Sequence, residues 1–194
     1  MNQTSNYYNQ HAQAFFENTY QVEMESLYVP FLRYLPEQAS ILDLGCGSGR
    51  DILAFKKKGY QVEAIDYSAE LVKKARELTN IEVCQQSFYD LAENNKYDGI
   101  WACASLLHCD RDRLPEVMGR IFKALKPNGV LYMSFKYGNT DREKDGRQFT
   151  DLDEQQAQAL LDQLDGVELL QQWVSVDKRP DRNEEWLNIL WKKQ

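Results

Sequence analysis

The chain has 194 residues, the length of one ordinary α/β domain, and leaves little room for a second full domain. Its formal net charge of -7 at pH 7 and its pI near 5.0 disfavour the broad cationic surface that nucleic-acid binders need, and so favour a small-molecule partner. Residues 2–5 are polar, unlike a leader peptide, and no stretch approaches the roughly 20 apolar residues of a membrane span. We therefore expect a cytoplasmic protein without a membrane partner.

Helical and strand-like patterns alternate along the first 135 residues. Residues 6–35 carry aromatic and aliphatic side chains at helical spacing, and Pro36 ends them, which predicts helices before the first strand. Strands are then expected at 41–44, 61–65, 81–84, 97–104 and 130–135. Helices are expected after the glycine-rich turn as far as Lys58, over 69–78 and over 114–125. This alternation predicts a parallel sheet with right-handed crossovers and helices on both faces.

The C-terminal part has a different pattern. A helix is expected at 152–164, followed by two strand-like runs at 167–176 and 185–191. A loop containing Pro180 joins the two runs. The pattern predicts an antiparallel pair at the edge of the sheet.

The four cysteines show no disulfide framework. Cys46, Cys84 and Cys103 lie in or beside predicted buried strands, so we expect reduced thiols that behave as small buried hydrophobic residues. Cys103 and Cys109 flank His108, as in a soft metal site. No CxxC pair or second ligand pair accompanies them, and we predict no metal.

The segment Ile41 to Arg50 reads ILDLGCGSGR and carries the clearest chemical signal. Glycines at alternate positions, Gly45, Gly47 and Gly49, remove side chains where a strand turns sharply into a helix, so that a ligand can touch the main chain. Such a turn directly after an apolar strand indicates a nucleotide-type ligand.

Two acidic residues specify that ligand further. Asp66 closes the second predicted strand, where a carboxylate can accept both ribose hydroxyls of an adenosine. Asp43 precedes the turn, where its charge would repel a pyrophosphate, and the third glycine comes two rather than three residues after the second. A cationic sulfonium and amino group suit such an acidic site better.

The string ILDLGCGSGRD, followed by AIDYS at 64–68, resembles the class I S-adenosylmethionine-dependent methyltransferase superfamily. It is nearest to the small tellurite-resistance-type and methyltransferase domain 11/25 members, and the resemblance covers about residues 7–135. It implies an enzyme that uses S-adenosylmethionine, with an α/β, three-layer Rossmann-like sandwich. The sheet would be seven-stranded and mostly parallel, with a C-terminal antiparallel hairpin.

The resemblance also assigns cofactor contacts. It implies that Gly45, Gly47 and Gly49 approach the methionine and adenosyl parts, that Asp66 holds the ribose and that Tyr67 packs against the adenine. The acidic residue that usually reads the adenine amino group falls at Ser87, whose hydroxyl could serve together with the backbone of Phe88.

The end of the fourth predicted strand is where this superfamily brings the acceptor to the methyl group. Small residues there, Cys103 and Ala104, would leave room for the sulfonium. His108 is the candidate general base, because a histidine titrates near neutral pH. A packed residue at the start of a helix is the alternative interpretation of His108.

Three regions could read the acceptor. Tyr7, Tyr8 and Tyr20 could form a lid, or could pack in the core. The cations Lys136 and Arg147 follow the fifth strand, and Arg179 and Arg182 precede the last strand. If both loops converge, they could bind an anionic acceptor; solvated loop charge is the alternative. We expect a single domain over 1–194, with a helical lid at 1–38, a cofactor-binding half at 39–136 and an acceptor-side half at 137–194.

The predicted activity is methyl transfer to a small acceptor, anionic or thiol-containing. An RNA acceptor stays an alternative, since carboxymethyl-uridine tRNA methyltransferases resemble the same motif. A non-catalytic S-adenosylmethionine-binding module and a nicotinamide-dependent oxidoreductase are others. Methylation of a metalloid is a further alternative, but only Cys103 and Cys109 would be left to bind the metalloid. The sequence leaves the oligomeric state open.

Overall fold

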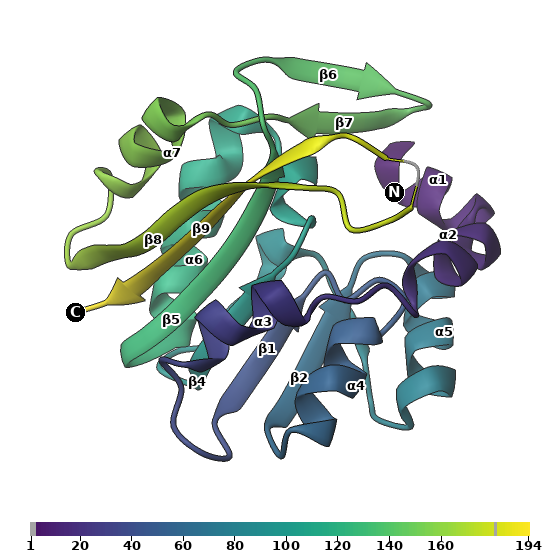
Figure 1. The fold of residues 1–194 in the computed structure, drawn as a ribbon, viewed down its shortest axis with the longest axis horizontal. Coiled ribbons are helices and arrows are strands. Elements are labelled where there is room, and N and C mark those ends of the chain that lie inside the picture. Colours follow the sequence, from purple (N-terminus) through teal and green to yellow (C-terminus); the bar gives the residue numbers. More distant parts are fainter. Residues whose placement is uncertain (1–2, 181) are drawn as a thin grey trace.

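A computed structural model describes residues 3–180 and 182–194. One seven-stranded sheet runs through it in the order β3-β2-β1-β4-β5-β9-β8 (Figure 1). Its strands are β1 (Ser40–Leu44), β2 (Gln61–Asp66), β3 (Cys84–Gln85), β4 (Tyr97–Ala102), β5 (Leu125–Lys136), β8 (Val167–Val176) and β9 (Glu185–Lys193). Strands β1 to β5 are parallel, and β9 is antiparallel to both β5 and β8. The predicted fold class is confirmed.

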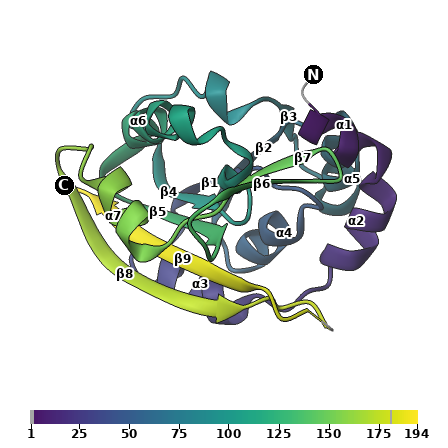
Figure 2. The ribbon, with the colours of Figure 1, turned by 90° about the horizontal axis from the view of Figure 1, so that it is seen from above.

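Helices cover both faces of this sheet, as Figure 2 shows from above. They are α3 (Glu25–Leu32), α4 (Arg50–Lys57), α5 (Ala69–Thr79), α6 (Leu114–Ala124) and α7 (Glu154–Leu161). The first two helices, α1 (Gln3–Gln10) and α2 (Ala12–Thr19), pack against α5. Neighbouring strand residues point to opposite faces: Ile100 packs in the core beneath α6 and α7, and Trp101 in the core beneath α3. No helix of the described part is long and apolar enough to cross a membrane.

Several expected boundaries are wrong. The strand expected over 97–104 ends at Ala102, and the strand expected over 130–135 begins at Leu125. The strand predicted over 81–84 is reduced to Cys84–Gln85, because this edge strand pairs only with the end of β2, and the Cys84 thiol is exposed rather than buried. The helix predicted to continue to 125 ends one residue earlier, and Leu125 already pairs with Tyr97. The helix predicted over 152–164 is only Glu154–Leu161, and a capping box formed by Asp153 begins it.

The chain after β5 is not a plain loop. It forms a separate two-stranded antiparallel sheet of β6 (Asp141–Lys144) and β7 (Arg147–Thr150). All four side chains of β6 are exposed, so the sequence lacks the alternation of apolar and polar residues that predicts a strand. The hairpin lies beside α1, as Figures 1 and 2 both show. Segments from both ends of the chain therefore meet above the sheet.

Candidate functional site

The turn between β1 and α4 has no room for side chains. The backbone φ of Gly45 is 83°, and a Cβ there would lie 2.5 Å from Cβ of Ser105. At Gly47 the φ is 54°, and a Cβ would lie 3.0 Å from the ring of Phe15. The backbone N–H of Gly45 donates to the carbonyl of Ile65 at 2.9 Å, which ties the turn to β2. The alternating glycines thus build a bare main-chain cradle.

Asp66 lies at the end of β2, facing this cradle. Its Oδ2 accepts the N–H of Gly47 at 2.8 Å, and its Oδ1 accepts the N–H of Ser68 at 2.8 Å. Burial raises the pKa of Asp66, and the backbone N–H donors of Ser68 and Gly47 oppose that rise. No cation is paired with this carboxylate in the described residues. Its remaining lone pairs can accept hydroxyl groups of a ligand.

A cavity of about 370 Å³ opens in front of Asp66. The sequence-predicted residues Tyr67, Ser87 and Phe88 line it. The Ser87 hydroxyl accepts the N–H of Tyr89 at 3.2 Å and so begins the short 3-10 helix Phe88–Asp90. Tyr67 is 40% exposed, so its ring is free to cover a flat ligand. The cavity joins the ends of β1, β2 and β3, as expected for a ligand at the carboxyl edge of a parallel sheet.

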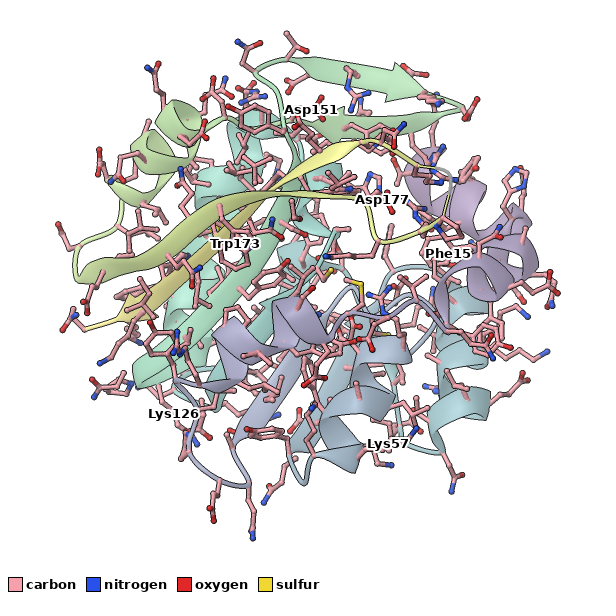
Figure 3. All side chains as sticks on the ribbon, viewed as in Figure 1. Phe15, Lys57, Lys126, Asp151, Trp173 and Asp177 are labelled. Atoms are coloured by element: carbon pink, nitrogen blue, oxygen red, sulfur yellow. The ribbon has the colours of Figure 1, made fainter. Side chains whose placement is uncertain are left out.

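A second cavity of about 450 Å³ lies beside it. Among the described residues, seven cationic and four acidic side chains line it, although the whole chain has a net charge of -7. The cations are Arg50, Lys136, Lys144, Arg147, Lys178, Arg179 and Arg182. The loops after β5 and before β9 do converge here. Phe15 of α2 and Asp177 of the β8–β9 loop, both labelled in Figure 3, also line this cavity.

Most of these cations are held by carboxylates. Lys136 donates to Glu184 at 2.6 Å, and Arg179 makes a bidentate pair with Asp177. Arg182 lies 3.9 Å from Glu184. These pairs orient long side chains that would otherwise be mobile, and they keep the guanidinium and ammonium groups on the cavity wall.

Arg147 is placed differently. Its guanidinium carbon lies 4.0 Å from the ring centre of Tyr7, and its Nη2 is 3.2 Å from the exposed carboxylate of Asp145. Its Nε is buried and makes no hydrogen bond within the described residues. Arg147 therefore retains donor capacity toward the cavity.

The wall between the two cavities contains His108. Six residues line both cavities: Tyr8, Phe15, Gly45, Gly47, Ala104 and His108. Nδ1 of His108 lies 2.7 Å from the carbonyl of Gln148, and Nε2 lies 2.8 Å from the hydroxyl of Tyr8. A carbonyl can only accept, so Nδ1 carries the proton and the Tyr8 hydroxyl donates to Nε2.

This environment keeps His108 uncharged. Burial lowers the pKa of His108 to about 4; the carbonyl of Gln148 opposes this, and the charges of Arg147 and Lys136 act with it. At neutral pH His108 is thus a neutral imidazole with both nitrogens engaged. Cys103 lies nearby on the larger cavity, and burial raises its thiol pKa to about 12, so it is not a thiolate.

Three sequence-predicted residues line neither cavity. Asp43 is 2% exposed behind the turn, and burial raises its pKa well above the usual range. A Cβ at Gly49 would contact Ala75 of α5, so this glycine permits close packing between the turn and α5. Tyr20 stacks on Phe16, with ring centres 4.8 Å apart. The structure therefore places Tyr8, and not Tyr20, against the site.

Sequence reasoning missed a buried polar cluster on the larger cavity. Asp51 accepts hydrogen bonds from Arg50 at 2.6 and 2.9 Å, from the Tyr28 hydroxyl at 2.5 Å and from the indole of Trp101 at 2.8 Å. Burial alone would raise the pKa of Asp51, but Arg50 and these donors outweigh it and lower the pKa. The partners Tyr28 and Trp101 come from α3 and β4, so no local pattern could reveal them.

The described part of the chain contains no cluster of side chains that could bind a metal ion. No three His, Cys, Asp or Glu side chains within it come together in a way that could hold a metal ion. Cys109 is buried, and burial raises its pKa to about 11.

Known proteins match the turn and its surroundings. A profile of the methyltransferase domain matches residues 41–129, just under half of the chain. The protein YqeM of Bacillus subtilis is 30% identical over 113 residues, which cover 53% of this chain and 46% of that protein. The ubiquinone biosynthesis O-methyltransferase of Xanthomonas campestris is 35% identical over 103 residues, which cover 50% and 42%. The matched region therefore spans less than half the length of either relative.

A solved structure matches over nearly the whole chain. The 1,6-didemethyltoxoflavin-N1-methyltransferase of Burkholderia thailandensis, solved with 1,6-didemethyltoxoflavin and S-adenosylhomocysteine, has a TM-score of 0.77. The match covers 95% of this chain and 83% of that chain at 21% sequence identity. At this identity the likeness establishes the shared fold.

Proposed function

We propose that this chain is a class I S-adenosylmethionine-dependent methyltransferase that acts on a small anionic acceptor, because a methyltransferase profile and methyltransferase relatives match its sequence and a methyltransferase structure shares its fold. S-adenosylmethionine would lie in the smaller cavity and the acceptor in the larger one. The observation that carries the proposal is that the two cavities adjoin and have six lining residues in common. Ligands in adjoining cavities can meet, and a methyl group can pass only between ligands that meet.

The smaller cavity fits the cofactor on chemical grounds. The cradle at Gly45 and Gly47 is open only because both residues lack a Cβ, and a bare main chain can approach a ligand closely. Asp66 has no cationic partner among the described residues and can accept hydroxyl groups of a ribose. Tyr67, Ser87 and Phe88 would surround the adenine, and Cys103 and Ala104 would border the sulfur. Bound S-adenosylmethionine would supply a methyl group already activated by its sulfonium charge.

The larger cavity fits a small acid. Lys136, Arg147, Arg179 and Arg182 bring cationic donors to one volume of about 450 Å³, which is the size of a site for a single small molecule. The Burkholderia methyltransferase was solved with 1,6-didemethyltoxoflavin, which is also a small molecule. The negative charge of the chain as a whole disfavours an RNA acceptor.

The residues of the chain have three tasks in this reaction. The cations position the acceptor, the cradle positions the cofactor, and the N-terminal helices exclude water. The lid over 1–38, of which residues 1 and 2 lie outside the described part, would act through α1 and α2. The Tyr8 hydroxyl joins this lid to His108 across the shared wall. We place His108 beside the bound acceptor, next to the atoms that react.

Calorimetric titration with S-adenosylhomocysteine tests the cofactor half. We expect one site per chain, strong weakening in Asp66→Ala and no change in Asp165→Ala, which removes an equal charge from the exposed surface. Equal binding by both variants would contradict the assignment.

Labelled S-adenosylmethionine with fractionated cell extract tests the acceptor half. We expect label in a product of low mass. Label in the RNA fraction would support the RNA alternative, and binding without any labelled product would support a non-catalytic module.

A further inference from the structure

Lys136 and Arg147 converge on one aromatic ring beside His108. The ring of Phe149 is 5% exposed, with Lys136 Nζ 5.0 Å and the Arg147 guanidinium carbon 5.2 Å from its centre. The imidazole centre of His108 lies 5.0 Å from the same ring. Both cations therefore lie near the wall that the two cavities share, rather than at the outer rim.

Neither the carboxylates nor His108 offer a free base at this position among the described residues of the larger cavity. Its four carboxylates are each paired with a cation: Asp51 with Arg50, Asp145 with Arg147, Asp177 with Arg179, and Glu184 with Lys136. His108 has Tyr8, Gln148, Arg147 and Lys136 around it, and both of its nitrogens are engaged. None of these groups is poised to take a proton from a neutral, weakly acidic acceptor. The other histidine of the cavity, His11, is exposed, and its ring centre lies 4.3 Å from that of Tyr7.

The walls of the cavity favour a flat acceptor. Its aromatic side chains come from α1, α2 and the strands β5, β7 and β9. They are Tyr7, Tyr8, Phe15, Tyr132, Phe149 and Trp186. Aromatic faces and cationic donors around one small volume suit a planar acid.

We propose that Lys136 and Arg147 bind the reacting atom of the acceptor, and that this atom is an anionic oxygen or sulfur of a planar acid. This inference rests on the proposed function and specifies where the acceptor's charge lies. A lone pair of that atom forms the bond to the methyl carbon while the carbon–sulfur bond breaks and its electron pair stays on sulfur. The anion and the sulfonium both lose their charge, and no proton moves. The two cations hold the acceptor in its anionic form, and His108 is not required as a base.

Two probes of nearly equal shape test the subsite. The 194-residue chain, saturated with S-adenosylhomocysteine, is titrated with benzoate and with benzamide in phosphate-free buffer, and its melting temperature is followed. We expect benzoate to raise the melting temperature and benzamide to leave it unchanged. In Lys136→Met and Arg147→Met we expect benzoate affinity to fall by about tenfold or more. Lys57→Met, an equal charge change on the exposed end of α4 (Figure 3), should respond like wild type.

Binding of S-adenosylhomocysteine by each variant shows that it is folded, and Lys136→Arg supplies a further check because it keeps the charge and should keep much of the benzoate response. The proposal is overturned if benzoate and benzamide act alike, if neither acts, or if the benzoate response survives in Lys136→Met and Arg147→Met. Failure of the wild-type protein to bind S-adenosylhomocysteine would instead refute the proposed function, before any probe is added.

Discussion

The carboxylate of Asp66 accepts the backbone N–H of Gly47 at 2.8 Å, so the acid of β2 and the turn after β1 form one structural unit. The same carboxylate accepts the N–H of Ser68, which begins α5. Both partners are backbone N–H donors, so both side-chain atoms at position 66 must be hydrogen-bond acceptors. Asp66 therefore shapes the cradle as well as lining the smaller cavity.

Asp66→Asn should weaken S-adenosylhomocysteine binding about tenfold to a hundredfold. An asparagine has one acceptor oxygen, so its amide group would face the N–H of either Gly47 or Ser68, donor against donor. Calorimetry measures the affinity, and Glu77→Gln on the exposed face of α5 is the matched control. Wild-type affinity in Asp66→Asn would refute this geometry.

Gly45→Ala should both destabilise the protein and abolish tight cofactor binding. A left-handed backbone costs an alanine about 1–2 kcal/mol, and the added Cβ would overlap Ser105. Gly59→Ala is the control, because φ there is +90° but no atom lies within 4 Å of the new Cβ. Urea unfolding should show a larger loss for Gly45→Ala, and only Gly59→Ala should retain binding.

Tyr8→Phe should loosen the N-terminal helices. It removes the hydrogen bond to His108, worth about 1 kcal/mol, so amide hydrogen exchange in α1 and α2 should rise by about fivefold. Hydrogen-exchange mass spectrometry measures this. Tyr20→Phe, outside both cavities, should leave exchange unchanged. An equal rise in both variants would argue against a specific role of the Tyr8–His108 hydrogen bond.

His108 should make stability depend on pH. Its pKa is about 4 in the folded protein against 6.5 when unperturbed, so the folded state binds fewer protons between these values. The contribution is complete above about pH 6.5 and is lost as pH falls toward 4. Between pH 7 and pH 4.5 wild type should lose on the order of 2 kcal/mol more than His108→Gln. Chemical denaturation checks this, and His11→Gln, an exposed histidine, should follow wild type.

Asp51→Asn should destabilise the protein by about 3–5 kcal/mol. The change leaves the guanidinium of Arg50 without its counter-charge in a partly buried place, and weakens the bonds from Tyr28 and Trp101. Urea unfolding with Asp165→Asn as control measures the loss. A loss no greater than the control's would show that the Asp51 cluster contributes little to stability.

The amino-acid sequence determined the architecture and located the glycine-rich turn and the acidic residue that face the smaller cavity. Alternation of strands and helices predicts the parallel sheet, and the last two strands were expected as an antiparallel pair, because hydrophobic periodicity depends only on neighbours in the chain. The turn at Gly45 and Gly47 and the acid at Asp66 stand out for the same reason, since each lies at the end of a strand whose position the pattern reveals.

Only the tertiary structure decided which polar residues meet. It brings Tyr8 to His108 across 100 positions of sequence, places Arg147 on a hairpin with no apolar alternation, and joins Asp51 to Tyr28 and Trp101. It also removes Asp43 and Tyr20 from the cavity walls. Hydrogen bonds and charge pairs between distant elements depend on how helices pack over the sheet, and local periodicity carries no record of that packing.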